Sequence, residues 1–357
     1  MNICMVTGAV PGVRCGVEDY TFQLAQSLTA GGTAIDLVRE ADWTVAGTRR
    51  AIAAIRAARP DIVHIQYPAL GYGASIGPHL LAGLAGAPVL LTLHEYSAFR
   101  LPKRSSLLAF AIAARHIIFT TGFERDRFLG LFPWCRSKSS IVPIGSNIPF
   151  LPHRPTPGAR IAFFGQLRPD RGLEACLELA RLAKERGRDW RVQIIGGLNP
   201  EHRDYLAGLG ARAAGLDVEW LVDLEAEAVA QLLSRASAVY LPYPDGVSER
   251  RGTLMAALGN QAAIVTTDGP FRPSEIEQAV RLANGTEEAF EALEAIIDDA
   301  AAAANMRAEA ARLADRYDWG RISEEHLRLY ARFAPADRRS STPPQQFGRI
   351  HVDPWRR

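Results

Sequence analysis

The stretch DIVHIQYPALGYGASIGPHLLAGLAGAPVLLTLH, residues 61–94, indicates the fold of the first part of the chain. It opens with one apolar run (61–67) and closes with another (88–94), and a helical pattern separates them. Neither run alternates between apolar and polar residues, which is typical of strands buried on both faces. Two such strands joined through a helix predict a parallel βαβ unit.

The same rhythm extends outward on both sides. Further strands of this first part are expected at 2–8, 34–40, 116–121 and 140–145. Residues 16–32 form a helical pattern that ends on Gly-Gly, as helices often do. The segment 147–160 then carries four prolines and no periodicity, so we predict that it is a linker between domains.

After the linker the alternation restarts, with strands expected at 160–165, 190–197, 216–221, 236–242 and 262–267. The Ala/Glu-rich segment 286–315 predicts one long helix, and 319–333 predicts an amphipathic helix. We therefore predict an α/β protein of two Rossmann-like, doubly wound domains that face a cleft. The predicted parts are a first domain (1–148), a second domain (149–318), a closing helix (319–333) and a loose tail (334–357).

The composition is that of an ordinary soluble globular protein, with 48% hydrophobic and 22% charged residues in 357. The formal net charge is +2, so nothing global points to nucleic acid, and any anion binding must be local. The longest apolar candidate, 105–119, falls short of the ~20 residues that span a bilayer.

The four cysteines form no C-x-x-C pair, and their spacing suits neither zinc nor a disulfide framework. We expect a reduced, cytoplasmic protein without a metal site. The N-terminus, MNICMVTG, has neither the basic region nor the long apolar core of a signal peptide.

Doubly wound sheets bind ligands at the carboxyl ends of their strands, so the residues after each strand are the candidates. Gly8, Gly12 and Gly16 follow the first strand and precede a helix that we expect to begin at Val17. Such a loop frees backbone N–H groups for an anion. An ordinary strand-to-helix turn is the alternative.

The stretch FFGQLRPDRGLE, residues 163–174, follows the first strand of the second domain. Gly165 ends the strand, and Arg168 and Arg171 precede the helix expected at Leu173. These residues are either surface arginines or a site for a pyrophosphate. Cations at a helix start oppose the helix dipole, which favours the phosphate site.

The stretch DGVSERRGTLMAALG, residues 245–259, follows another strand of the second domain. Glu249 there is followed by Arg250, Arg251 and Gly252, and a helix is expected from about Thr253. An acid in the first turn of a helix is favourable in its own right. That does not explain two arginines, so we predict a second contribution to an anion site.

Polar residues also end two strands of the first domain. His64 and Gln66 end one, and His94, Glu95 and Arg100 end or follow the other. These histidines are either catalytic or structural. Lys103 and Arg104, beside an apolar stretch, fit either an anionic membrane surface or an ordinary amphipathic helix with a basic cap.

Six motifs in order resemble the family-four nucleotide-sugar glycosyltransferases, which have the GT-B fold. They are CGVEDYTFQLAQSLTAGG (15–32), PDIVHIQYP (60–68), LLTLHEY (90–96), IVPIGSNI (141–148), FFGQLRPDRGLE (163–174) and WGRISEEHLRLY (319–330). The likeness extends to about Phe333.

By this resemblance, Gly16 lies against the donor diphosphate and His94 lies near the reacting sugar carbon. Arg171 replaces the phosphate-binding lysine of the family. The family arginine falls on Gln166, with Arg168 beside it to supply the charge.

The two motif glutamates of the family match this sequence poorly. The first falls on Ser248 or Glu249, and the second, which commonly holds the ribose, falls on Ala256 or Ala257.

The resemblance implies transfer of a sugar from a nucleoside-diphosphate donor to an acceptor hydroxyl. Retention of anomeric configuration and no metal or other cofactor are expected. The implied residues are catalytic His94 and Glu249; donor-binding Gly16, Gly165, Gln166, Arg168, Arg171, Ser248, Arg250, Arg251 and Gly252; and acceptor-side His64, Glu95 and Arg100. Two alternatives stay open: a binding or scaffolding protein that has lost activity, and a nucleotide-sugar epimerase.

Overall fold

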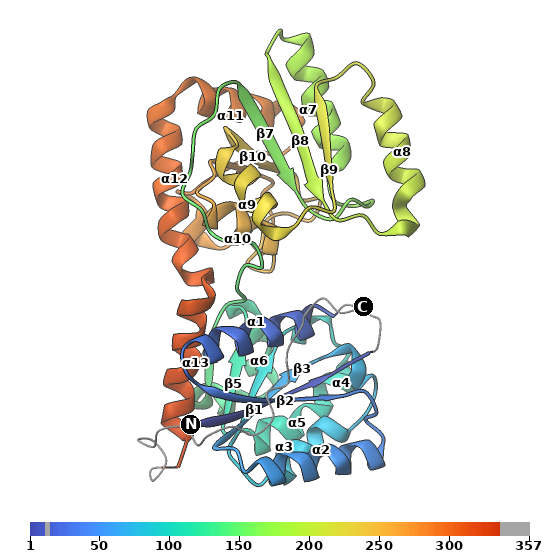
Figure 1. Ribbon diagram of the computed structural model, residues 1–357, viewed down its shortest axis with the longest axis vertical. Coiled ribbons are helices and arrows are strands. Elements are labelled where there is room, and N and C mark those ends of the chain that lie inside the picture. The colour runs from blue at the N-terminus through green and yellow to red at the C-terminus, as the bar shows by residue number, and fades with distance from the viewer. Residues whose placement is uncertain (11–14, 336–357) are drawn as a thin grey trace. The chain divides into compact units, whose positions relative to one another are not determined.

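The computed structural model describes residues 1–10 and 15–335, and the chain divides into two units. The first unit comprises Met1–Ile144 and the chain from Trp319, and the second comprises Gly145–Asp318. The division thus falls after Ile144, where the sequence suggested residue 148. Each unit contains a parallel six-stranded sheet with helices against it, which confirms the doubly wound α/β prediction (Figure 1).

The sheet of the first unit has the strand order β2-β1-β3-β4-β5-β6. Its strands are β1 (Asn2–Gly8), β2 (Ala34–Glu40), β3 (Ile62–Tyr67), β4 (Val89–Leu93), β5 (His116–Phe119) and β6 (Ser139–Ile141). The central strands are buried along their whole length, because helices cover both faces. The order reverses direction between β1 and β3, which is the switch point where such sheets bind ligands.

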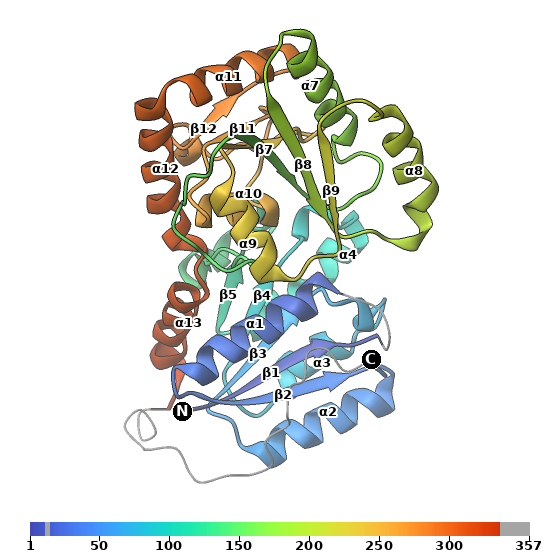
Figure 2. The same cartoon turned by 45° about the horizontal axis from the view of Figure 1, so that its top comes forward.

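Two separate apolar cores lie on the two faces of this sheet. One contains residues of α1 and α13, which lie side by side in Figures 1 and 2. The other contains residues of α2, α3, α5 and α6. The helices are α1 (Gly16–Ala30), α2 (Val45–Ala58), α3 (Gly77–Leu84), α4 (Leu101–Ser106), α5 (Leu108–Ala113), α6 (Gly122–Leu131) and α13 (Trp319–Phe333), with 3₁₀ helices η1 (Leu70–Tyr72), η2 (Tyr96–Ala98) and η3 (Pro133–Lys138).

The sheet of the second unit has the strand order β12-β11-β10-β7-β8-β9. Its strands are β7 (Ala159–Phe164), β8 (Trp190–Gly196), β9 (Val218–Val222), β10 (Ala238–Leu241), β11 (Ile264–Thr266) and β12 (Val280–Leu282). Here the direction of the order reverses between β7 and β10, so the loops that follow these two strands flank the switch point.

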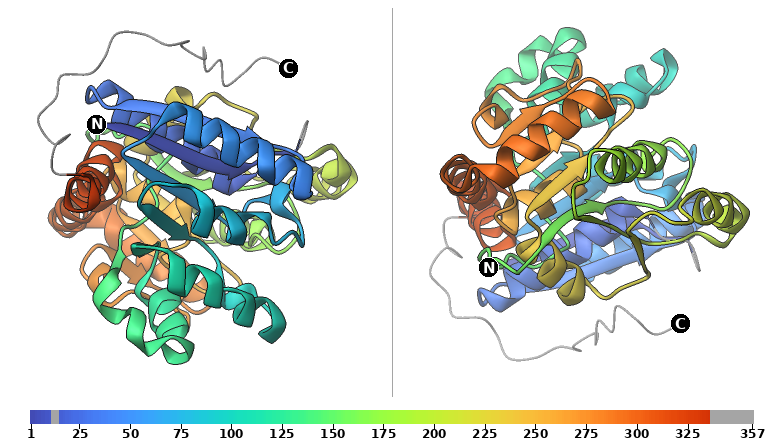
Figure 3. Two further views of the ribbon diagram at one scale, coloured as in Figure 1. Left: turned by 90° about the horizontal axis from the view of Figure 1, so that it is seen from below. Right: turned by 90° about the horizontal axis from the view of Figure 1, so that it is seen from above.

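The helices of the second unit pack against this sheet and against one another. Helices α7 and α11 are neighbours, as the green and orange helices of Figure 3 (right) show. The helices are α7 (Leu173–Glu185), α8 (Arg203–Arg212), α9 (Ala226–Arg235), α10 (Gly252–Gly259), α11 (Thr286–Asp298) and α12 (Ala300–Ala314), with 3₁₀ helices η4 (Pro200–His202), η5 (Ser274–Ile276) and η6 (Asp315–Tyr317). Among the described helices of both units, none has the length and apolar character needed to cross a membrane.

The structure corrects two predictions in the second unit. The single helix predicted over 286–315 is two helices, α11 and α12, because the chain leaves helical geometry at Asp299. The side chain of Asp299 then accepts hydrogen bonds from the N–H groups of Ala301 and Ala302 and caps α12. The short strand β12 was not predicted.

Candidate donor and catalytic site

The loops after β7 and β10 meet in the second unit at the switch point of its sheet. Gly172, which precedes α7, has φ +81°, and a Cβ there would lie 2.1 Å from the carbonyl oxygen of Pro242. Pro242 directly follows β10. Only glycine fits so close to a backbone with a positive φ. The sequence therefore holds the arginine-bearing loop of residues 165–172 against the end of β10.

Three guanidinium groups from these two loops lie within electrostatic reach of one another. Partial burial lowers the pKa of Arg171, and the positive charges of Arg168 and Arg251 lower it further. Asp245 and Asp170 act in the opposite direction. We call Arg168, Arg171 and Arg251 the arginine cluster. Like charges in a half-buried setting repel, so an anion bound there would be stabilised.

Neighbouring side chains hold two members of the arginine cluster in place. The guanidinium of Arg251 lies 4.6 Å from the ring centre of Tyr243 and pairs with Asp245. The Nε–H of Arg168 donates to Oε1 of Gln166 at 3.1 Å. Gln166 thus orients a cation, which is a role that the sequence did not suggest.

Two helices begin beside the arginine cluster without a side-chain cap. Neither Gly172 before α7 nor Arg251 before α10 gives a capping side-chain hydrogen bond, whereas Thr44, Thr121 and Asp299 cap other helices of the chain. Uncapped N–H groups at a helix start attract anions. Other helices, such as α9 and α11, also begin without a side-chain cap, so the anion site at these two loops stays a prediction.

Neither steric crowding nor backbone conformation requires a glycine at the start of α10. A Cβ on Gly252 would meet nothing within 4 Å, and no positive φ requires glycine there. The residue is exposed, so it leaves room beside the helix start for a ligand. Gly165 differs, because a Cβ there would lie 2.9 Å from the Phe163 ring, which is a packing reason for glycine.

The remaining predicted residues of this loop point to different neighbours. Arg250 lies over the ring of Phe271, 5.8 Å from its centre. Glu249 lies near Tyr317, whose pKa burial raises to about 12 with a further contribution from that carboxylate. Ser248 accepts a backbone hydrogen bond from Arg251 at 3.1 Å. Both positions considered for the ribose carboxylate, Ala256 and Ala257, are fully buried within α10.

In the first unit, His94 directly follows β4 and is only 7% exposed. Its Nε2 lies 3.1 Å from Oε1 of Gln66, and because this oxygen can only accept, Nε2 carries the proton. The ring packs edge-to-face on Tyr20 at 4.8 Å. Burial lowers the pKa of His94 to about 3, with His326 adding to the effect, so the imidazole is neutral at ordinary pH.

His64 has no exposed surface, which overturns its predicted place among acceptor contacts. Its Nδ1 shares a hydrogen bond of 2.7 Å with the hydroxyl of Tyr330, and its Nε2 shares one of 2.7 Å with Thr92. The amide nitrogen of Gln66 lies 3.3 Å from the same ring. His64 therefore supports Gln66, which in turn orients His94.

The helix α13 completes this buried network. Nδ1 of His326 donates to the carbonyl oxygen of Ile322 at 2.8 Å, so its Nε2 accepts from the hydroxyl of Tyr20 at 3.4 Å. The amphipathic stripe of this helix predicted packing, but it did not reveal that Tyr330 and His326 contact the histidines at the sheet. Tyr20 was missed altogether.

Gly16 begins α1, and a Cβ there would meet nothing within 4 Å. No positive φ requires glycine at this position either, and the preceding residue Cys15 gives no capping side-chain bond. An open helix start follows the switch-point strand β1, as the phosphate prediction for Gly16 requires. Gly12, also named in that prediction, lies outside the described residues.

Glu95 and Arg100, the other predicted acceptor-side residues, are both exposed. Glu95 precedes η2 and Arg100 precedes α4. Both therefore lie on the loop that leads away from His94 at the carboxyl end of β4.

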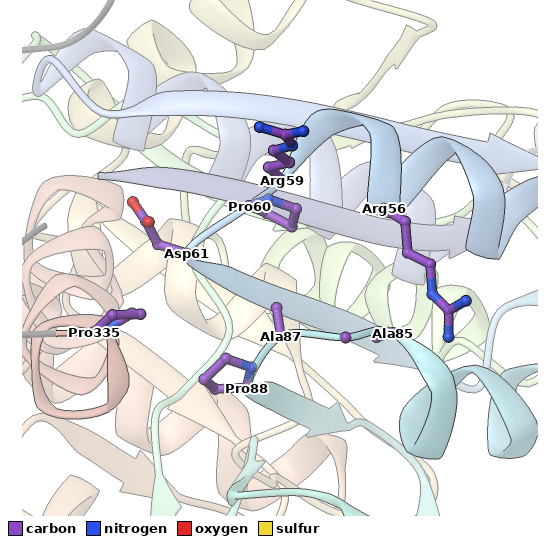
Figure 4. Close-up of a pocket in the computed structure, with 9 residues that line it drawn as sticks. Arg56, Arg59, Pro60, Asp61, Ala85, Ala87, Pro88 and Pro335 are labelled. Atoms are coloured by element: carbon purple, nitrogen blue, oxygen red, sulfur yellow. The ribbon is translucent and has the colours of Figure 1, made fainter.

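A pocket of the first unit lies away from this site. It has a volume of about 360 Å³ and is lined by Arg56, Arg59, Asp61, Pro88 and neighbouring residues (Figure 4). Asp61 precedes β3 and Pro88 precedes β4, so the pocket lies at the amino ends of the strands. Doubly wound sheets use the opposite edge for their ligands.

Two doubly wound parallel sheets, with a last helix that belongs to the first unit, define the GT-B class of fold. Solved structures that share it include a glycosyltransferase from Rickettsia africae (TM-score 0.74, 13% identity, covering 93% of this chain and 98% of that one). Another is Anabaena HepE solved with UDP and glucose, with a TM-score of 0.65 and 14% identity over 93% of this chain and 100% of that one. A third is sucrose-phosphate synthase from Thermosynechococcus elongatus, with a TM-score of 0.63 and 15% identity over 93% of this chain and 98% of that one.

The family evidence comes almost entirely from the first unit. Residues 34–148 match the model of Glycosyltransferase Family 4. No curated protein matches the chain in sequence. The family match over this segment and the fold shared with these structures agree with the resemblance to family-four glycosyltransferases that the motifs indicated.

Proposed function

We propose that this protein transfers a sugar from a nucleoside-diphosphate donor to an acceptor hydroxyl, with retention of anomeric configuration and without a metal ion. The observation that carries the proposal is the arginine cluster beside the uncapped starts of α7 and α10. Donors of this kind occur among the similar structures, since Anabaena HepE has been solved with UDP-glucose.

The chemistry follows from the charge that develops during transfer. As the bond from the sugar to the diphosphate breaks, negative charge grows on the leaving oxygen. Arg168, Arg171 and Arg251 are fixed cations that stabilise this charge, which is the task a metal ion performs in other transferases. The open helix start at Gly252, in the same unit as these arginines, supplies backbone N–H groups.

His94 has a separate part in the proposal, near the reacting carbon. Its protonated Nε2 is held by Gln66, so Nδ1 is the nitrogen left to accept a hydrogen bond from substrate. A neutral imidazole does not repel the positive charge that builds up on the sugar.

The test is titration calorimetry of the wild type and two variants with UDP, GDP, dTDP and ADP. Arg171→Ala should weaken binding of the preferred nucleotide by about 1.5–3 kcal/mol, or roughly 10- to 150-fold, as expected for lost charged hydrogen bonds. Arg181→Ala is the matched control, because Arg181 lies exposed on the same helix α7 and pairs with Glu178 and Glu185. Unchanged affinity in Arg171→Ala would show that the phosphates bind elsewhere.

Retention and metal independence need a second measurement. Slow donor hydrolysis followed by proton NMR should first release the sugar with the anomeric configuration of the donor, at the same rate with and without EDTA. An inverted first product, or a rate abolished by EDTA, contradicts the corresponding part of the proposal.

The buried Ala256 and Ala257 favour one alternative, a binding protein that no longer turns over a donor. The two functions separate in the same titration. A wild type that binds none of the four nucleotides would support the binding protein and exclude the transferase.

A further inference from the structure

One side of the first unit exposes large hydrophobic side chains to an unusual extent. Of the twelve that are exposed among the described residues of the chain, seven lie between residues 70 and 112. Soluble proteins rarely leave such side chains together at the surface unless something covers them.

These side chains form stripes on neighbouring helices. Ile76, Leu80 and Leu84 recur at intervals of four along α3 and its first flanking residue, and are 64%, 46% and 48% exposed. Leu108 and Ile112 repeat the interval on α5, at 45% and 70%.

The two helices pack together on one face of the sheet. His79 of α3 stacks on Phe110 of α5 at 4.5 Å between ring centres. Because both helices bury their opposite sides in the same core, their exposed stripes face away from the sheet together. Leu101, 68% exposed at the start of α4, extends this surface. We call Ile76, Leu80, Leu84, Leu101, Leu108 and Ile112 the apolar face.

Positive charges predominate in the segment that carries most of the apolar face. Between residues 68 and 115 the chain carries Arg100, Lys103, Arg104 and Arg115 but a single carboxylate, Glu95. The whole chain, by contrast, is nearly balanced at +2. An apolar surface with such an excess of cations is complementary to an anionic lipid surface, where acyl chains take up the apolar groups and headgroups attract the cations.

The apolar face also adjoins the end of the sheet that carries His94. The ammonium of Lys103 lies 5.8 Å from the ring centre of Tyr67, the last residue of β3. The carbonyl oxygen of Tyr67 accepts the backbone N–H of His94 at 2.9 Å. A surface docked on the apolar face would therefore lie beside the predicted acceptor-side residues.

We propose that the apolar face and its flanking cations dock this protein on an anionic membrane surface. Docking through α3, α4 and α5 would present the site of the proposed function to an acceptor held in that membrane. This last consequence rests on the proposed function, whereas the docking itself does not.

The test is co-sedimentation with vesicles of phosphatidylcholine containing about one third phosphatidylglycerol, compared with pure phosphatidylcholine. Wild type should bind the anionic vesicles, bind pure phosphatidylcholine far more weakly, and release as salt rises towards about 1 M. The double variant Leu84→Gln/Ile112→Gln should bind at least about tenfold more weakly, because two exposed apolar side chains are lost. Leu224→Gln, an exposed leucine of the second unit, is the control and should bind like wild type.

Each outcome decides the proposal. Failure of the wild type to bind anionic vesicles at low salt, or equal binding by the double variant, overturns it. It is also overturned if sedimentation equilibrium shows a wild-type dimer that the double variant converts to a monomer, since the apolar face would then join two copies of the chain. Nucleotide titration of the same variants should be unchanged, and a wild type that binds vesicles but no nucleotide would refute the proposed function while leaving docking intact.

Discussion

The buried histidines of the first unit should make its stability fall as the solution becomes mildly acidic. Burial lowers the pKa of His94 to about 3 and that of His326 to about 4, and it lowers the pKa of His64 well below its ordinary value of 6.5. In the unfolded chain each histidine takes up a proton near pH 6.5, while the folded protein excludes it. Stability contributed by neutral burial is therefore complete above pH 6.5 and is lost as the pH falls towards 4.

The magnitude follows from proton linkage. For one histidine that stays neutral in the fold, the loss is about 0.4 kcal/mol at pH 6.5 and about 2 kcal/mol near pH 5, a difference of about 1.7 kcal/mol. His64, His94 and His326 together cost about 5 kcal/mol over the same interval, which is comparable with the whole stability of many domains, and the buried His116, whose pKa is also lowered to about 4, adds to the loss. Most carboxylates remain ionised near pH 5, so histidines dominate this window.

The variant His326→Gln removes one of the three groups and should recover about 1.7 kcal/mol of that loss, whatever it does to absolute stability. Pulsed hydrogen exchange over residues 61–94, with urea as denaturant, follows the unfolding of the first unit at the two pH values. The control Ser323→Ala removes a hydrogen bond to Ser27 of α1 from the same helix and should lower stability equally at both pH values. If His326→Gln fails to fold, His94→Gln tests the same point. A wild type that loses under about 1 kcal/mol between the two pH values would refute the burial argument.

Two glycine variants separate binding from folding. Gly16→Ala adds a methyl group where nothing lies within 4 Å, so thermal stability should be unchanged or slightly higher, while nucleotide affinity measured by calorimetry should fall about tenfold or more. Normal affinity in a folded Gly16→Ala variant would remove this helix start from the donor site. Gly172→Ala should instead cost about 3 kcal/mol or more of stability in urea unfolding, because the new Cβ would lie 2.1 Å from Pro242 at a positive φ. A loss below about 1 kcal/mol would show that the loop relaxes freely.

The strands could be predicted from the sequence because parallel strands buried on both faces read as continuous apolar runs. β8 is such a case, since six of its seven residues are buried. β12 could not be predicted, because a strand of three residues at the edge of a sheet is too short to show a hydrophobic pattern. Asp299 is a residue type that often caps helices, so the sequence does indicate a helix start there. The alanines and glutamates on either side favour helix so strongly that they outweigh this indication.

The role of His64 could not be predicted, because a strand-end histidine looks the same whether it faces a ligand or a helix. The role of His64 is decided by Tyr330, which lies 266 residues further along the chain and contacts the imidazole of His64. His64 lies within β3 against Tyr330, whereas His94 lies just beyond the end of β4 on the same face of the sheet. Only the packing of α13 on that face supplied this distinction.

The arginine cluster depends on strand order in a similar way. The loops after β7 and β10 are adjacent because these strands pair, although some seventy residues separate them in sequence. Sequence alone could not choose between Arg250 and Arg251, but only Arg251 lowers the pKa of Arg171 and packs on Tyr243. The cluster is an unfavourable arrangement in the protein without a ligand, since like charges are held together while partly buried. Removing Arg171 should therefore weaken nucleotide binding while leaving the unliganded protein as stable as the wild type or more stable. A structural residue would behave differently, because its removal would lower the stability of the unliganded protein.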